Sequence, residues 1–180
     1  MFKNFILTAV AILFISGCGR AEKIARIEQK CANNEAVWCL KLGKTYARRD
    51  INKGVMYYQK ACDLGDKRGC YRLAVLLNSK SINSKKDNET IVKSLTKSCD
   101  LGTPKACFEL GEYYEDDPKM QSKANELFAK SCEQRFGLAC YKLADFYGER
   151  NDAAAQKSYL ELACKYRYKA ACEEVAEDKK

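Results

Sequence analysis

The 180-residue sequence contains no histidine. It therefore cannot supply a serine–histidine–carboxylate triad, a histidine-ligated zinc or an imidazole that titrates near neutral pH. Hydrolases that depend on any of these groups are excluded within this chain. The sequence also lacks any sustained alternation of apolar and polar residues, which half-buried strands require. We therefore expect an all-α fold without a sheet.

Long apolar runs are scarce as well. The segment from Phe5 to Ile15 is an apolar run of 11 residues. As a helix it would be about 16 Å long, which is too short to cross a bilayer core of about 30 Å. The run ends in Ile15-Ser16-Gly17-Cys18, which is similar to a bacterial lipobox. An export signal over residues 1–17 is therefore expected, with lipid attached to the Cys18 sulfur. An ordinary secretory signal with a chance cysteine is the alternative.

Export fixes the expected location and the expected partners. Gly19 stands where an Asp would favour inner-membrane retention, so we expect a lipoprotein facing the periplasm, in the outer rather than the inner membrane, or at the cell surface. The periplasm is oxidising, so disulfides are expected. The net charge of +8 then points to anionic envelope components rather than to nucleic acid, although simple solvation of long helical faces is the better explanation of the charge.

Cysteine is abundant and regularly spaced. Ten of the 11 cysteines form five pairs that are eight positions apart. Each pair sits in a repeat: a large apolar residue stands four places before the first cysteine, and a small residue stands four places after the second. The first cysteines are 31, 37, 33 and 32 positions apart, and a period in the thirties with helical spacings predicts stacked helix pairs. The pairs are Cys31/Cys39, Cys62/Cys70, Cys99/Cys107, Cys132/Cys140 and Cys164/Cys172.

Helix starts and stops can be placed inside these repeats. Acidic or hydroxyl residues are expected to cap the helix starts, and glycines are expected to end the helices. The cap and stop residues are Asp50, Gly65, Asp66, Gly102, Thr103 before Pro104, Asp117 before Pro118, and Asp152.

The predicted domains are a signal peptide (1–17), a lipid-anchored N-terminus (18–20) and one domain of about five helix pairs (21–180) with a polar surface loop at 79–88.

Two cysteines eight positions apart can form a disulfide only if the chain reverses direction between them. Eight residues along one helix rise about 12 Å, whereas a disulfide needs Cα atoms within about 7 Å. A bonded pair would therefore join the last turn of one helix to the first turn of the next. Free buried cysteines or metal ligation remain alternatives, although zinc-binding pairs usually stand closer together. We expect neither a metal nor a cofactor.

The segments Ala61–Ala74 and Lys97–Gly111 carry the Cys-Asp-Leu-Gly turn between paired cysteines. They resemble Sel1-like repeats of the Helicobacter cysteine-rich protein family. This resemblance implies a tetratricopeptide-like superhelix in which each helix pair is bridged by a disulfide. The first, fourth and fifth repeats lack the Leu-Gly turn, so less regular turns are expected there. Members of this family are often named β-lactamases, with penicillin binding and weak hydrolysis, and others are described as secreted binders of proteins or peptides.

The residues give little support for an enzyme. One Ser-x-x-Lys motif occurs, Ser94 to Lys97, but the Ser-Asp-Asn and Lys-Thr-Gly elements that serine β-lactamases add to it are absent. The lysine position also recurs in other repeats as Lys60 and Lys130, so the repeat itself explains Lys97. We assign no catalytic residue, and Ser94 and Lys97 are weak candidates only. A weak β-lactamase remains the alternative function, implied by the resemblance.

A binding module is the preferred function. Solenoids present a concave face lined mainly by one helix of each pair, and tyrosines suit such a groove. We therefore expect a peptide or an envelope protein in the groove. Tyr46, Tyr114 and Tyr147 recur in the repeat and are expected in the core. The candidate groove residues are Lys53, Tyr57, Lys93, Ser94, Asn125 and Tyr159, with Tyr166 and Tyr168 as surface candidates.

Overall fold

The computed structural model describes residues 19, 21–79 and 85–177, and these are helices joined by short turns, with no strand among them. Cys18 and its leader lie outside the described residues. The predicted fold class, an all-α solenoid of helix pairs, is confirmed. The described helices are a segment over 21–32, α2 (Ala36–Tyr46), α3 (Ile51–Asp63), α4 (Lys67–Ser79), α5 (Lys85–Asp100), α6 (Pro104–Glu115), α7 (Gln121–Glu133), α8 (Gly137–Gly148), α9 (Ala153–Lys165) and α10 (Lys169–Glu177).

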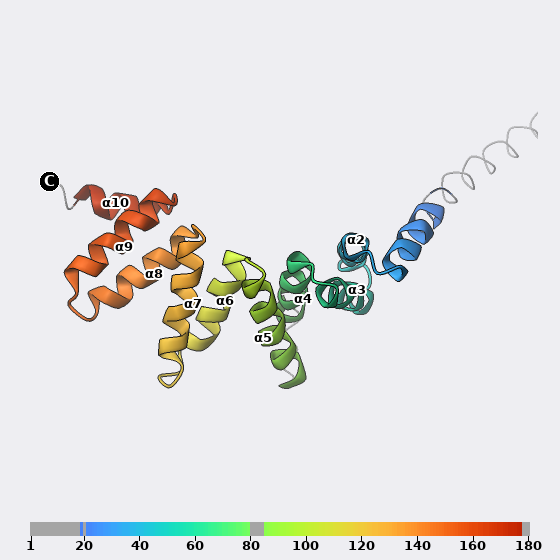
Figure 1. Ribbon diagram of the computed structural model, residues 1–180, viewed down its shortest axis with the longest axis horizontal. Helices are drawn as coiled ribbons and strands as arrows, with labels where there is room; N and C mark the ends of the chain where they lie inside the picture. Colours follow the sequence, from blue (N-terminus) through green and yellow to red (C-terminus); the bar gives the residue numbers. More distant parts are fainter. Residues whose placement is uncertain (1–18, 20, 80–84, 178–180) are drawn as a thin grey trace, which may run out of the picture. The chain divides into compact units, whose positions relative to one another are not determined.

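The chain divides into two compact units, with the boundary between Gly69 and Cys70. In the first unit, α2 packs against α3. In the second unit, each helix from α5 to α10 packs against the next one along the chain (Figure 1). Contacts between sequence neighbours are what a repeat protein requires, since no repeat can bury its apolar face alone.

Within each unit, disulfides join the two helices of a pair, as the sequence predicts. The Cα atoms of the bonded cysteines are 4.6–4.8 Å apart in the four pairs Cys31–Cys39, Cys99–Cys107, Cys132–Cys140 and Cys164–Cys172. Cys62 and Cys70 are disulfide-bonded as well. In the second unit the first cysteine lies in the last turn of one helix, and its partner lies in the first turn of the next. The alternatives of free thiols and metal ligation are thereby removed.

The turns inside the pairs are more alike than the sequence suggests. Gly65 and Gly102 adopt the expected positive φ, at 86° and 80°. Asn34, Arg135 and Arg167 occupy the same position in the other repeats, with φ of 64°, 67° and 67°. In every case two backbone hydrogen bonds of 2.8–3.2 Å close the turn, donated by this residue and by the next one. The expectation of less regular turns in the outer repeats is therefore wrong, because these bonds impose the geometry without glycine.

The predicted helix starts are correct at three positions. The carboxylates of Asp50, Asp66 and Asp152 accept backbone N–H groups of Lys53, Arg68 and Ala155 at 2.9–3.1 Å. These bonds satisfy donors that the first helical turn leaves without a partner.

Two other predicted starts need correction. Thr103 occupies the cap position of α6, but its hydroxyl makes no cap hydrogen bond and is buried without a partner. Asp117 accepts the N–H of Lys119 in a turn, and α7 begins only at Gln121. A short aspartate side chain can close such a local turn instead of capping a helix.

The predicted surface loop at 79–88 is shorter than expected. Ser79 ends α4 and Lys85 begins α5, so only 80–84, which lie outside the described residues, separate the two helices. The polar segment from Lys85 onward carried no apolar period to reveal it as a helix. An acidic residue in the first turn, Asp87, suits the positive end of a helix dipole.

In two repeats the small residue makes room for a large one on the following helix. A methyl group built on Gly111 of α6 would lie 2.6 Å from the Phe128 ring of α7. Gly43 of α2 faces the ring of Tyr58 on α3 in the same way. Phe128 and Tyr58 are the large apolar residues four places before a first cysteine, so these two repeat positions form one packing contact.

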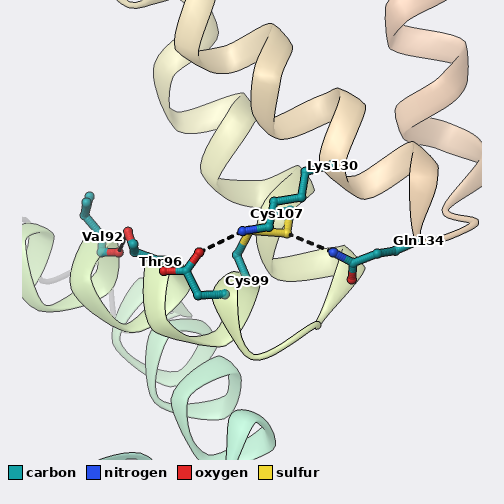
Figure 2. Close-up of polar contacts among 7 residues, drawn as sticks. Val92, Thr96, Cys99, Cys107, Lys130 and Gln134 are labelled. Carbon is teal, nitrogen blue, oxygen red and sulfur yellow. Dashed lines mark hydrogen bonds and ion pairs between the residues drawn. A yellow bond between two sulfur atoms is a disulfide. The ribbon is translucent and has the colours of Figure 1, made fainter.

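Polar contacts connect the bridged end of one pair to the next pair. Figure 2 shows Lys130 and Gln134 beside the Cys99–Cys107 disulfide. Lys130 Nζ donates to Asp100 Oδ1 at 2.7 Å, and Gln134 Nε2 donates to Cys107 Sγ at 3.9 Å. The lysine that recurs two places before each of three first cysteines thus has a structural function here, at Lys130.

Candidate binding groove

Two hollows on the second unit share lining residues and form one continuous groove, which we call the joined groove. One hollow of about 410 Å³ is lined by α7, α8 and α9, and one of about 310 Å³ is lined by α6, α7 and α8. Gln121, Asn125 and Phe146 line both. The groove thus runs across four consecutive helices, α6 to α9, whose order along the chain can be followed in Figure 1.

The half of the joined groove toward α9 is aromatic. Tyr147 of α8 and Tyr159 of α9 stack with ring centroids 5.4 Å apart and planes 8° apart. The Arg150 guanidinium lies 3.6 Å from the centroid of the Phe146 ring. Burial, followed by the neighbouring Tyr147 and Glu133, raises the pKa of Tyr159 above its ordinary value. At neutral pH its hydroxyl is therefore protonated and can donate a hydrogen bond.

The half toward α6 is acidic. Its lining includes four carboxylates, from Glu115, Asp116, Asp145 and Glu149, and one ammonium, from Lys142. Lys142 Nζ pairs with Glu115 Oε2 at 2.9 Å. Burial, and then the negative charges of Glu174 and Glu149, raise the pKa of Asp145 although Lys142 opposes them. Excess negative charge therefore gathers here on a chain whose net charge is +8.

Two of the predicted groove residues meet in the joined groove. Asn125 on α7 lines both of its hollows, and Tyr159 on α9 lines the larger one. Their side chains come from the first helix of two successive pairs, as expected for a solenoid groove. Lys93 is exposed on α5, outside this lining.

Lys53 and Tyr57 belong to a cluster in the first unit. The Tyr57 ring stacks on Tyr46 with centroids 5.5 Å apart, and its hydroxyl donates to Glu28 Oε1 at 3.3 Å. Lys53 Nζ lies 5.2 Å from the centroid of the Tyr46 ring. Both side chains therefore already have partners on neighbouring helices. Burial, and next the charge of Glu28, raise the pKa of Tyr57.

One predicted site residue needs correction. Ser94 is only 3% exposed, so it neither lines an open groove nor presents a nucleophile, because the inner face of α5 carries it into the core. Tyr166 and Tyr168 are half-buried against the hydrophobic core of the last two pairs, and the Tyr168 ring lies 4.9 Å from that of Tyr141. Both lie outside the lining of the joined groove.

Sequence reasoning missed the contribution of α8. Tyr147 recurs in the repeat and was expected in the core, whereas the structure leaves it half-buried beside Tyr159. Phe146, Asp145 and Glu149 carry no repeated signal at all. The two carboxylates at the end of α8 could have been noticed in the sequence. Their proximity to the carboxylates at the end of α6 could not.

Other features give no second site. A hollow of about 630 Å³ on α4, α5 and α6 borders Ser79, and one of about 550 Å³ on α9 and α10 borders Glu177, so both adjoin residues outside the described ranges. Within those ranges no His, Cys, Asp and Glu side chains are grouped so that they could hold a metal ion. None of the helices that could be searched there combines the length and apolarity of a membrane span.

Known structures share this fold. A Sel1 repeat protein from Oxalobacter formigenes matches with a TM-score of 0.65 and 19% identity, over 81% of this chain and 64% of that one. This chain therefore spans less than two thirds of that protein. Cysteine rich protein B of Helicobacter pylori matches with a TM-score of 0.52 and 28% identity, over 69% of this chain and 94% of that one.

A third match is YrrB, described as a TPR protein with an unusual peptide-binding site. Its TM-score is 0.52 at 15% identity, over 91% of this chain and 87% of that one. No curated protein matches the sequence. The Sel1 repeat model matches residues 32–66, 104–136 and 137–173, which is more than half of the chain. Together with the bridged helix pairs, this match shows that the chain belongs to the Sel1 repeat family.

Proposed function

We propose that this chain is a protein-binding module that holds an extended peptide segment in the joined groove. Sel1 and tetratricopeptide-like repeats are typical protein-binding scaffolds, and YrrB is described as having a peptide-binding site. The observation that carries the proposal is the continuity of the groove over four helices, with Gln121, Asn125 and Phe146 shared by both hollows.

The lining suits a peptide chain. The Asn125 amide offers both a donor and an acceptor, which match the N–H and C=O groups of an extended backbone. The stacked rings of Tyr147 and Tyr159 offer apolar area beside hydroxyls, and rigid aromatic side chains lose little conformational entropy on binding. The groove would therefore hold the backbone at its centre and a side chain of the ligand at its aromatic end.

The binding test uses the oxidised mature domain and a library of displayed random 12-residue peptides. Selected peptides should lose at least about tenfold in affinity on Asn125→Ala and on Tyr159→Ala, since each removes a central contact. The control is Lys93→Ala, which changes an exposed residue outside the groove and should bind like the unchanged domain. If the selected peptides bind both groove variants as tightly as they bind the unchanged domain, the proposal is refuted.

We further propose that the protein is a lipoprotein form of the Helicobacter cysteine-rich family, exported and anchored through lipid on Cys18. The lipobox-like Ile15–Cys18 segment supports this, and the disulfides are compatible with an oxidising compartment. Lipid chains attached at Cys18 would make the anchor stable. Mass spectrometry should find lipid on the mature protein and none on Cys18→Ala, and an unlipidated mature protein would contradict the anchor.

A further inference from the structure

We infer that the acidic half of the joined groove selects a peptide segment carrying lysine or arginine, an inference that rests on the proposed function. The groove offers four carboxylates and one ammonium in its α6–α8 half. A cationic side chain of the ligand would enter where negative charge is in excess, while the rest of the segment follows the groove toward α9.

Within the described residues, the protein pairs only one of these four carboxylates with a cation. Lys142 pairs with Glu115, whereas Asp116, Asp145 and Glu149 form no ion pair within the described part of the chain. The neighbouring acids Glu174 and Glu149 raise the pKa of Asp145, after the effect of burial. This is the behaviour of a carboxylate that lacks a sufficient positive partner. An incoming cation would supply that partner.

Aromatic rings add a second attraction for a cation. Within this groove Lys142 Nζ lies 6.0 Å from the centroid of the Phe128 ring, and the Arg150 guanidinium lies 3.6 Å from that of Phe146. Ring faces attract ammonium and guanidinium groups, and the long apolar stems of these side chains pack on such surfaces. Carboxylates beside the half-buried Phe146 ring therefore match lysine and arginine better than neutral polar side chains.

The same charges disfavour acidic ligands. An aspartate- or glutamate-rich segment would place like charges together, which costs affinity and slows association. The positive net charge of the whole chain would not predict this preference, because Lys and Arg outnumber Asp and Glu by 32 to 24. The selectivity of the groove is thus opposite to what the overall composition suggests.

The experiment compares peptide selection on two forms of the oxidised domain. The displayed 12-residue library is selected on the unchanged domain and on the double variant Asp145→Asn with Glu149→Gln. A control double variant, Glu161→Gln with Glu173→Gln, removes the same charge from exposed positions on α9 and α10 outside the joined groove. Individual binders are then measured at low and at moderate salt.

Groove-dependent binders, defined by loss of binding on Asn125→Ala, should be rich in Lys and Arg and poor in Asp and Glu. They should bind the groove double variant about three- to tenfold more weakly, bind the control like the unchanged domain, and weaken as salt rises. Groove-dependent binders without basic enrichment would overturn the inference and leave the proposed function standing. A library that yields no groove-dependent binder would overturn both.

Discussion

In three of the turns inside bridged helix pairs, a residue with a side chain occupies a backbone position that usually calls for glycine. Asn34, Arg135 and Arg167 have φ between 64° and 67°, a region that costs an ordinary L-residue roughly 1–2 kcal/mol. The two turn hydrogen bonds and the adjacent disulfide hold this geometry in each repeat. The strain is therefore tolerated because the surrounding structure determines the turn independently of this side chain.

Replacing one of these residues by glycine should stabilise the protein. Arg135→Gly relieves the left-handed strain but adds freedom to the unfolded chain, so we expect a net gain of about 0.5–1 kcal/mol in the free energy of unfolding. Urea denaturation of the oxidised domain measures it. The matched control is Gly65→Ala, which has no atom within 4 Å of the added methyl group and should lose about 1 kcal/mol through φ alone. A loss of stability in Arg135→Gly would contradict this account.

Tyr141 connects α8 to α10 through its hydroxyl, which donates to Glu174 Oε1 at 2.6 Å. This hydrogen bond, followed by burial and the charge of Asp145, raises the pKa of Tyr141 to about 12. The folded pKa lies above the unfolded value of about 10. The contribution of this bond to stability is therefore fully present below pH 10 and is lost as the pH rises through 12.

Titration of tyrosine by ¹³C NMR should show this shift. Glu174→Gln should bring the pKa of Tyr141 back toward 10, because the carboxylate acceptor and its charge disappear together. Glu173→Gln is the matched control, since Glu173 pairs with Lys169 on the exposed side of α10 and should leave the titration of Tyr141 unchanged. An unshifted Tyr141 in the unchanged protein would show that the bond does not persist in solution.

At the scale of helices, the repeat spacing correctly predicts which segments pair and where they are bridged. The step of eight between cysteines and the recurring small residue were both visible in the sequence. The start of α7 was not, because Asp117 and Pro118 mimic a helix start while closing a turn. Nor was the helical turn at 85–88, whose polar residues carry no period. Periodicity thus locates buried helix faces well and exposed helix ends poorly.

The contact between Gly111 and Phe128 can be tested by a double-mutant cycle. Gly111→Ala places a methyl group 2.6 Å from the Phe128 ring, and overpacking of this kind typically costs 1–3 kcal/mol. Phe128→Leu should recover part of that loss, because Ala74 and Leu95 occupy the same two repeat positions in one buried cluster. Thermal unfolding of the four proteins gives the coupling energy. Strictly additive effects would contradict size complementarity between these positions.

At the scale of the whole chain, the class of fold could be predicted and the candidate groove only in part. Asn125 and Tyr159 were identifiable because they fall on the outward face of the first helix of a pair. The acidic half was not, since Glu115 on α6 and Asp145 on α8 come together only when the repeats stack. Ser94 shows the opposite error, because a residue judged by helix face alone proved to be buried.

The repeat architecture also predicts how damage spreads along the chain. Each helix of the second unit packs against its sequence neighbours, so stability is carried repeat by repeat. Removing the bridge between α7 and α8 by Cys132→Ala with Cys140→Ala opens a ring of nine residues, worth about 2.5 kcal/mol in the chain-entropy estimate. Amide hydrogen exchange should accelerate in α7, α8 and α9, while α2 and α3 stay as protected as before.

The matched control, Cys31→Ala with Cys39→Ala, should accelerate exchange in α2 and α3 and leave α7, α8 and α9 as protected as before. If either variant loosens all of these helices equally, the chain unfolds as one cooperative unit and local bridging does not explain its stability.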